Sequence, residues 1–259
     1  MGLTVTVLGC DGSYAGPDGA CSGYLVSCGD THVWLDCGPG TLANLQRHID
    51  LHDLTAIVVS HSHPDHWAEL PVAYNALGYY FDRRAVPVYG TTDTGERLRV
   101  AKGGRIEEVF DWHTITDGSK FEVGDLRLQC AVTDHPVETL AMRVCANGSC
   151  LGYTADTGSA WSLSTLGEDI DMLLCEATFP EDRAGQFPHL TASEAGAAAR
   201  EAGVARLVLT HLLPGSDHEL ARDTAATAFG NDVEIASGEE FEVESIEVEE
   251  QEAECIAPR

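Results

Sequence analysis

The chain has 259 residues, of which 44% are hydrophobic, and it carries a formal net charge of −27 at pH 7. This length and composition allow one large domain or two small ones with a sizeable core. The charge repels polyanions at long range and therefore argues against non-specific binding to nucleic acid.

The N-terminal run at 3–8 is strand-like and lacks the basic and apolar segments of a signal peptide. No apolar run approaches the length of a membrane span. We expect a soluble cytoplasmic protein with no membrane association. The nine cysteines form an odd set without a Cys-x-x-Cys pair, which favours free buried thiols in a reducing compartment over a disulfide scaffold.

Short β-branched runs alternate with helical patterns through the first two thirds of the chain. Strands are expected at 3–8, 23–28, 32–36 and 55–59, with helices near 40–48 and 67–79. Further strands are expected near 86–89, 106–110, 120–133, 139–145, 150–154 and 171–176. Asn147-Gly148 is typical of a two-residue hairpin turn between two of these strands.

The last third contains the best-marked helix, which Thr191 caps, Glu194 supports three residues later and Gly203 stops. A strand at 206–210, a helix near 217–229 and strands near 233–236 and 240–243 follow. We interpret 1–243 as one α+β domain of two β layers covered by helices. The glutamate-rich stretch 244–259 is expected to be a polar tail of low order.

Three imidazoles and a carboxylate lie within six residues directly after the apolar run 56–59. They are His61, His63, Asp65 and His66. The composition of the chain predicts about 0.0015 chance occurrences of this arrangement. Neutral imidazole and carboxylate suit Zn²⁺ or a neighbouring transition metal, and a strand that leads into a tight turn can hold them on one side. The segment therefore predicts a metal site.

Three more ligand-type residues directly follow predicted strands, and each could point into a common rim. They are His135, Asp156 and His211. Singly, each could equally be structural, but their shared placement favours one site. Asp36 also ends a strand, where it could brace a turn or accept a hydrogen bond from a ligating imidazole.

His189 lies just before the capped helix at 191, in a loop flanked by glycine and proline. Because helix N-termini favour anions, this histidine could donate to a substrate oxygen or protonate a leaving group. Capping of the loop is the alternative interpretation. The other five histidines, at 32, 48, 52, 113 and 218, are interpreted as surface residues.

The order of these residues resembles the metallo-β-lactamase superfamily: His-x-His-x-Asp-His, a distant His, an Asp at a strand end and another distant His. The resemblance covers nearly the whole chain and implies a four-layer αββα sandwich with a dinuclear metal centre at one edge. It implies that His61, His63 and His135 bind one metal, that Asp65, His66 and His211 bind the other, and that Asp156 bridges them.

Within the superfamily, His189-Leu190-Thr191-Ala192 is similar to a segment of the ribonuclease Z-like branch, whose members cleave phosphodiesters. The glycine-rich opening at 9–13 and the segment 22–25 resemble short actinobacterial members described as cyclic-nucleotide phosphodiesterases. Ribonuclease Z carries a tRNA-grasping arm between the positions of His135 and Asp156, where this chain has only twenty residues. With few basic residues to contact phosphate, a small substrate is favoured over pre-tRNA and nucleic acid.

The resemblance thus implies a phosphodiesterase with two divalent metal ions, Zn²⁺ first and Mn²⁺ or Fe as alternatives. Metal-bound hydroxide would attack phosphorus, His189 would stabilise the developing charge or protonate the leaving alkoxide, and Asp65 would share in proton handling. Lactone, ester or thioester hydrolysis, pre-tRNA cleavage and a non-catalytic metal sensor stay open as alternatives. A small phosphodiester is the expected partner, and the resemblance also suggests a homodimer.

Overall fold

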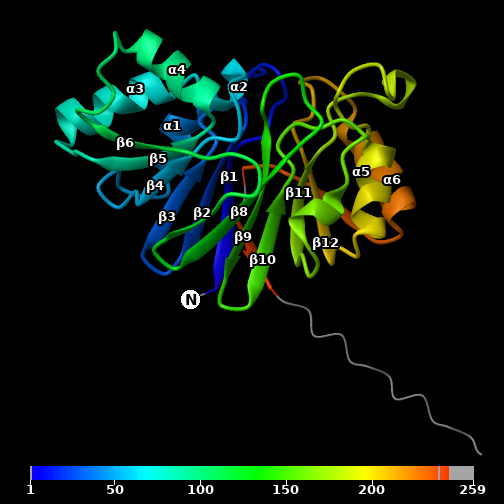
Figure 1. The fold of residues 1–259 in the computed structure, drawn as a ribbon. Coiled ribbons are helices and arrows are strands. Elements are labelled where there is room, and N and C mark those ends of the chain that lie inside the picture. The colour runs from blue at the N-terminus through cyan, green and yellow to red at the C-terminus, as the bar shows by residue number, and fades with distance from the viewer. Residues whose placement is uncertain (1, 239, 245–259) are drawn as a thin grey trace, which may run out of the picture.

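The computed structural model describes residues 2–238 and 240–244, which form two seven-stranded sheets between two groups of helices (Figure 1). The first sheet has the order β14 (Glu240–Val243), β1 (Leu3–Gly9), β2 (Gly23–Cys28), β3 (Thr31–Leu35), β4 (Ala56–Val58), β5 (Val86–Gly90) and β6 (Phe110–Thr114). The second has the order β13 (Val233–Ile235), β12 (Arg206–Thr210), β11 (Met172–Glu176), β10 (Ser149–Tyr153), β9 (Leu140–Ala146), β8 (Leu126–Val132) and β7 (Lys120–Val123).

Both sheets are mixed, with antiparallel hairpins at one end and parallel strands at the other. In the first sheet the pairs from β3 to β6 are parallel, and in the second the pairs from β10 to β13 are parallel. The carboxyl ends of parallel strands lie at the same sheet edge, so residues that follow them gather there.

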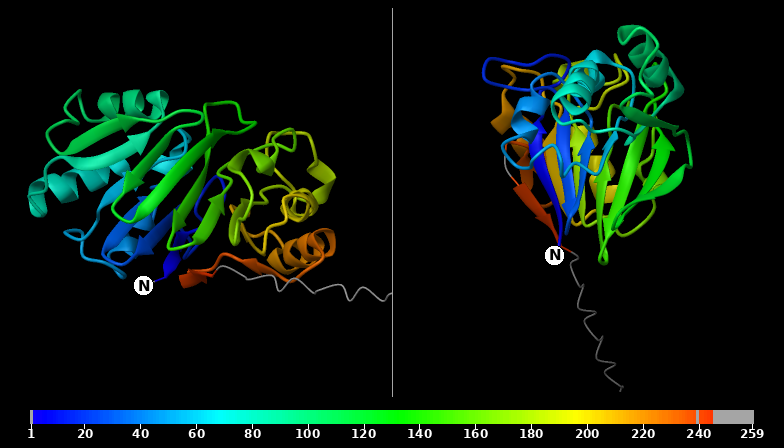
Figure 2. Two further views of the ribbon diagram at one scale, coloured as in Figure 1. Left: turned by 60° about the horizontal axis from the view of Figure 1, so that its bottom comes forward. Right: turned by 90° about the vertical axis from the view of Figure 1, so that its left-hand side faces the viewer.

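Helices cover the two outer faces, as the turned views show (Figure 2). The first sheet carries α1 (Thr41–Leu45), α2 (Pro64–Trp67), α3 (Leu70–Asn75), a π-helical turn η1 (Ala76–Tyr80) and α4 (Thr92–Ala101). The second carries α5 (Ala192–Glu201), α6 (His218–Phe229) and the 3₁₀ turn η2 (Leu163–Leu166), and a further 3₁₀ turn η3 (Glu181–Arg183) precedes α5.

The main apolar core lies between the sheets, where the rings of Tyr24 and Tyr153 have centroids 5.2 Å apart. Two further cores join each sheet to its helices. The predicted α+β sandwich of two β layers covered by helices is therefore confirmed.

Helix α4 was not expected, although Thr91 caps it by accepting a hydrogen bond from the amide of Thr94. Gly95 weakens its sequence signal because glycine disfavours helix interiors. The glycine is required by packing, since a Cβ there would lie 2.7 Å from the Trp112 indole. The strand expected at 106–110 begins only at Phe110, four residues later.

Two long predicted elements are each divided. The strand expected at 120–133 is the β7–β8 hairpin, which turns at Gly124 with a φ of +52°. The helix expected at 67–79 is α3 followed by η1, where Gly78 packs so closely on Val109 that a Cβ would lie 2.4 Å from its Cγ2.

The expectation of free thiols throughout is wrong for Cys145 and Cys150, which form a disulfide. The β9–β10 hairpin places the two residues directly opposite each other. The amide and carbonyl of Cys150 both bond to Asp171, so the cysteines form a non-hydrogen-bonded pair, the kind in which facing side chains lie closest. Six other described cysteines form no disulfide.

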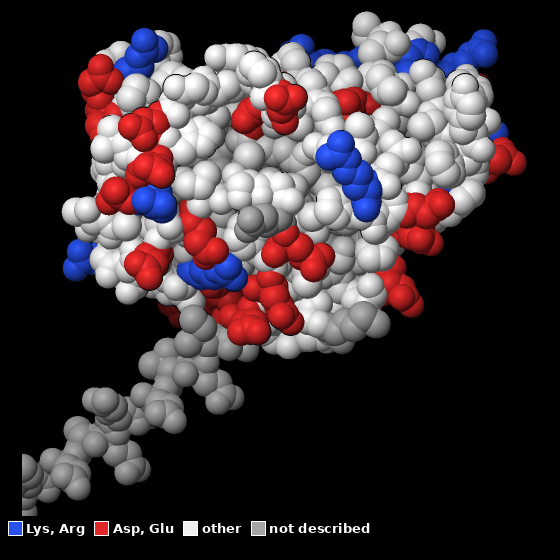
Figure 3. All heavy atoms as spheres, turned by 180° about the vertical axis from the view of Figure 1, so that it is seen from behind, with Lys and Arg blue, Asp and Glu red and all other residues white. Residues whose placement is uncertain are grey.

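Asp and Glu side chains are spread over the face opposite that of Figure 1, with fewer Lys and Arg among them (Figure 3). No helix in the described part of the chain combines the length and apolarity of a membrane span. The predicted tail lies, apart from Glu244, outside the described residues.

Candidate metal centre

The sequence candidates meet where the carboxyl ends of strands from both sheets converge. Segment 59–66 follows β4 and includes the start of α2, His135 follows β8, Asp156 follows β10 and His211 follows β12. Pro64 is the first residue of α2, where its missing amide hydrogen costs no helical bond. The expected strand-end arrangement is therefore what brings these distant side chains together.

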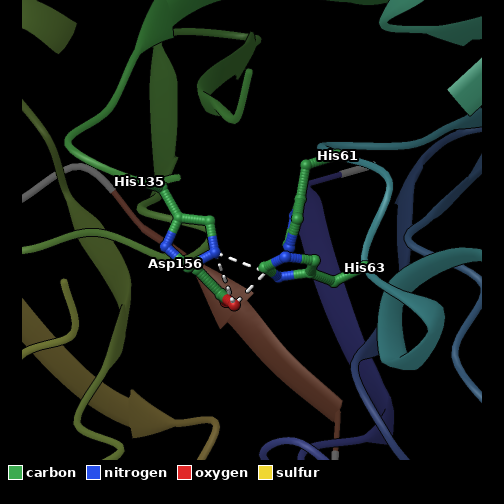
Figure 4. A group of neighbouring side chains, drawn as sticks. All are labelled: His61, His63, His135 and Asp156. Carbon is green, nitrogen blue, oxygen red and sulfur yellow. Dashed lines mark hydrogen bonds and ion pairs between the residues drawn. The ribbon is translucent and has the colours of Figure 1, made fainter. Parts of the chain in front are cut away.

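His61, His63, His135 and Asp156 form the first group, and their side chains point toward one another (Figure 4). Nε2 of His135 lies 3.1 Å from Nδ1 of His63 and 3.8 Å from Oδ2 of Asp156. Nε2 of His61 lies 3.5 Å from the same oxygen. The four ligand atoms lie within 4.8 Å of one another, close enough to surround one cation.

Asp65, His66 and His211 form the second group. Nε2 of His211 lies 3.2 Å from Oδ2 of Asp65 and 3.3 Å from Nε2 of His66. Oδ1 of Asp156 lies 3.3 Å from Nε2 of His66 and 3.5 Å from Nε2 of His211. One oxygen of Asp156 thus faces each group, which is the geometry that a bridging carboxylate requires.

Four of the five imidazoles are held through the nitrogen that faces away from the centre. The partners are Ser60 Oγ for His61 at 3.0 Å, Asp36 Oδ2 for His66 at 2.8 Å, the Pro188 carbonyl for His135 at 3.2 Å and Thr178 Oγ1 for His211 at 2.7 Å. Such partners fix the ring orientation and leave the other nitrogen for a metal.

Asp36 is buried, and its carboxylate connects three residues around the site. Its carboxylate accepts hydrogen bonds from the Ser60 amide at 2.7 Å, the Ser60 hydroxyl at 2.8 Å and the Tyr153 hydroxyl at 2.7 Å, and it also contacts His66. The two interpretations of Asp36 from sequence, bracing a turn and orienting an imidazole, both describe these contacts.

The electrostatics of the first group favour the states that bind metal. Burial and neighbouring imidazoles lower the pKa of His61, and burial lowers the pKa of His63 and of His135, so these rings are neutral near pH 7. Burial opposes ionisation of Asp156, but the surrounding histidines outweigh it and hold its pKa well below the usual range. Its carboxylate is therefore charged.

Two buried polar atoms of the centre lack a hydrogen-bond partner, Nε2 of His61 and Oδ1 of Asp156. Buried polar atoms are rarely left unsatisfied in native proteins, and a bound cation would satisfy both. The donor set of five imidazoles and two carboxylates suits Zn²⁺, Mn²⁺ or Fe. The side chains present thus fit a dinuclear metal centre.

His189 stands beside both groups, with its ring centroid 5.1 Å from that of His135 and 5.7 Å from that of His211. Its Nδ1 lies 3.0 and 3.1 Å from the carboxylate oxygens of Glu176. Burial lowers the pKa of His189, but the hydrogen bond and charge of Glu176 outweigh it and raise the pKa. Since Glu176 engages Nδ1, Nε2 is the nitrogen available to a ligand at the centre.

Glu176 is a functional candidate that the sequence reasoning missed. It is buried at the carboxyl end of β11 and also accepts hydrogen bonds from the Thr157 amide at 2.6 Å and the Thr178 hydroxyl at 2.6 Å. The sequence carried a signal for Glu176, because this residue stands at the end of a predicted strand, and Asp156 and His211 also stand at the ends of theirs.

Comparisons with known proteins agree with this geometry. Residues 31–212 match the family described as the beta-lactamase superfamily domain. An uncharacterized protein of Mycobacterium leprae is 37% identical over 258 residues, which cover 95% of this chain and 90% of that protein. A ribonuclease Z of Methanopyrus kandleri is 28% identical over 264 residues, covering 88% of this chain and 93% of that protein.

YhfI of Bacillus subtilis, described as a metallo-hydrolase, is 31% identical over 245 residues, covering 90% of this chain and 97% of that protein. The crystal structure of YhfI superimposes with a TM-score of 0.85 at 30% identity, and the match covers 93% of this chain and 100% of that one.

Proposed function

The chain belongs to the beta-lactamase superfamily and is a metal-dependent hydrolase, and on that premise we propose that it cleaves a small phosphodiester, in particular a cyclic one. The observation that carries the proposal is the Glu176–His189 pair beside the two ligand groups. A protonated imidazole beside the metals can stabilise the charge that develops on the phosphoryl oxygens and can protonate the departing alkoxide.

The seven clustered side chains would hold two metal ions, with Asp156 between them. When bound, two such ions lower the pKa of water and stabilise the oxygens of an in-line displacement. Glu176 holds Nδ1 of His189 and favours the protonated imidazole. The Nε2–H group can then donate to a phosphoryl oxygen or give its proton to the leaving oxygen. Asp65 of the second group is the other residue that we propose takes part in proton transfer.

The connection between His135 and Asp156 favours a small substrate. Most of it is the β9–β10 hairpin, whose strands belong to the second sheet. This connection therefore has no separate arm that could hold a tRNA. The chain's fifteen basic residues against forty-two acidic ones also disfavour a polyanion.

The test is hydrolysis of bis-p-nitrophenyl phosphate and 3′,5′-cyclic AMP by the metal-loaded protein. His189→Ala should lower kcat by about 10²- to 10⁴-fold because the proton donor is lost. His113→Ala is the matched control, since His113 is exposed on the edge strand β6, where it pairs with Asp111 at 3.0 Å. Turnover of homoserine lactones or acyl thioesters far above any phosphodiester would contradict the proposal, and so would activity that survives chelation.

A further inference from the structure

A groove of about 640 Å³ lies on the outer face of the second sheet, over β7 to β10. The β9–β10 turn beside it is at the far end of these strands from Asp156 and the metal centre (Figure 1). The Cys145–Cys150 disulfide lines this groove, with Cys145 half-buried and Cys150 more deeply covered.

The strand register places cationic side chains on the same face as the disulfide. Arg127 lies directly opposite Cys145, and Cys145 lies opposite Cys150. In the neighbouring row Lys120 lies opposite Gln129, which lies opposite Arg143. Because facing residues of an antiparallel pair have Cβ atoms about 4.5–5.5 Å apart, Arg127 is within reach of a molecule that touches the sulfur of Cys145.

The cations of the groove are unusual for this chain, which has only fifteen lysines and arginines and a net charge of −27. Lys120 is one of its two lysines. Within the described residues, neither Lys120 nor Arg127 forms an ion pair. Glu122, opposite Arg127 in the register, is the acidic residue that lines the groove. With the Asp171 carboxylate bonded to the Cys150 amide also counted, three cations stand against two acids, so the groove is a locally positive region on an acidic protein.

Arg143 contacts both sulfurs, with Nε 3.2 Å from Sγ of Cys145 and Nη2 3.3 Å from Sγ of Cys150. Its guanidinium is fixed by the backbone carbonyls of Leu166, Glu168 and Asp169. A guanidinium held in this position stabilises whichever sulfur leaves as a thiolate when the disulfide is opened.

We propose that Cys145–Cys150 is a thiol-exchange site whose groove selects small anionic thiols, such as those that carry a carboxylate. The incoming thiolate attacks Sγ of Cys145, the Cys145–Cys150 bond breaks, and Cys150 leaves with the electron pair as a thiolate beside Arg143. A second thiolate then attacks the mixed disulfide at the sulfur of the first thiol. This releases the oxidised small-molecule disulfide and leaves two cysteine thiols, so that two equivalents of thiol supply the two electrons.

The test compares three thiols of similar size that differ in charge: 3-mercaptopropionate, 2-mercaptoethanol and cysteamine. Disulfide opening is followed by alkylation and peptide mass spectrometry. Each rate is divided by the rate at which the same thiol opens bis(3-hydroxypropyl) disulfide, an uncharged reference that none of the three thiols forms on oxidation, which removes differences in intrinsic reactivity. The overall charge of −27 alone would favour cationic cysteamine. The groove is expected to reverse this order and to make 3-mercaptopropionate the fastest.

Lys120→Gln with Arg127→Gln should slow opening by 3-mercaptopropionate about tenfold and restore the preference for cysteamine. Lys102→Gln with Arg222→Gln, which removes the same charges outside the groove, should leave the order unchanged. High salt should abolish the preference in the unaltered protein, a measurement that needs no variant. The proposal would be overturned if cysteamine were preferred, if the three thiols reacted at equal rates, or if the groove variant kept the original order. It would also be overturned if Cys145 and Cys150 were isolated as thiols without reductant.

Discussion

Glu176 acts on His189 through charge as well as position. Its carboxylate raises the pKa of the imidazole, so His189 keeps its proton to higher pH. Activity that depends on this proton is full below the pKa of His189 and is lost as pH rises through it.

Glu176→Gln removes the negative charge and keeps the shape of the side chain. The pKa of His189 should fall, so the alkaline limb of the kcat profile should move to lower pH, and kcat at the optimum should fall about tenfold or more. A pH–rate profile with bis-p-nitrophenyl phosphate measures both effects. Glu181→Gln, in the exposed turn η3 of the same connection, should leave the profile in place. An unshifted limb in Glu176→Gln would show that His189 does not supply the proton.

His63 offers a separate test of the two-metal arrangement, because its imidazole belongs to the first ligand group and not to the second. His63→Ala should lower the bound metal from about two equivalents to about one, and activity should fall with it. Elemental analysis of the dialysed protein gives the stoichiometry. His113→Ala is the control, and full loading of His63→Ala would place the first metal elsewhere.

At the scale of elements, Asp36 ties the end of β3 to β4, α2 and β10 through the four contacts of its buried carboxylate. It has a φ of +58°, a conformation that asparagine also tolerates. Asp36→Asn therefore tests the carboxylate rather than the backbone.

In Asp36→Asn, buried donors around the new amide lose their acceptor, which should lower the free energy of unfolding by about 3 kcal/mol. Metal affinity should fall about 10- to 100-fold because His66 is no longer oriented. Urea unfolding of the metal-free protein and chelator competition measure the two effects. Asp169→Asn is a matched control, since Asp169 has the same φ but is exposed. Unchanged metal affinity would mean that Asp36 is purely structural.

The ends of strands were the most informative elements in the sequence. His135, Asp156 and His211 could be found because each directly follows an apolar β-branched run, and parallel strands bring such positions to one edge. Glu176 satisfied the same criterion but was counted as the last residue of its strand. Its role depends on contact with His189, thirteen residues away, which no local pattern encodes.

The disulfide was predictable from an element already identified. A two-residue turn at Asn147-Gly148 fixes the register of its hairpin and sets Cys145 opposite Cys150. The number of cysteines alone carries no information about this pairing. Helix α4, in contrast, was hidden by Gly95, whose presence reflects close packing of the helix on Trp112 of strand β6. Tertiary contacts of that kind cannot be read from local sequence.

At the scale of the whole molecule, the two sheets meet so that each supplies part of the metal centre. The segment from His61 to His66 leaves the first sheet, whereas His135, Asp156 and His211 leave the second. Separation of the sheets would therefore dismantle both ligand groups, which couples metal binding to the folding of the complete sandwich.

The net charge of −27 should also act on the substrate as a whole-molecule effect, because acidic side chains spread over the surface repel an anionic phosphodiester before it reaches the centre (Figure 3). Raising the ionic strength from about 0.01 to about 0.15 M shortens the Debye length from about 30 to about 8 Å and screens this repulsion. The KM for 3′,5′-cyclic AMP should therefore fall severalfold, with little change in kcat. Steady-state kinetics in potassium chloride and in potassium acetate separate screening from binding of a specific anion.

A chain that lacks residues 245–259 loses five glutamates and one arginine, so its KM should respond less to salt. Bound metal ions and a protonated His189 would create the opposite local field, which attracts an anionic substrate and weakens when salt is added. The sign of the salt effect therefore decides which field controls substrate approach. A KM that rises with ionic strength in both chains would show that the positive centre outweighs the acidic surface.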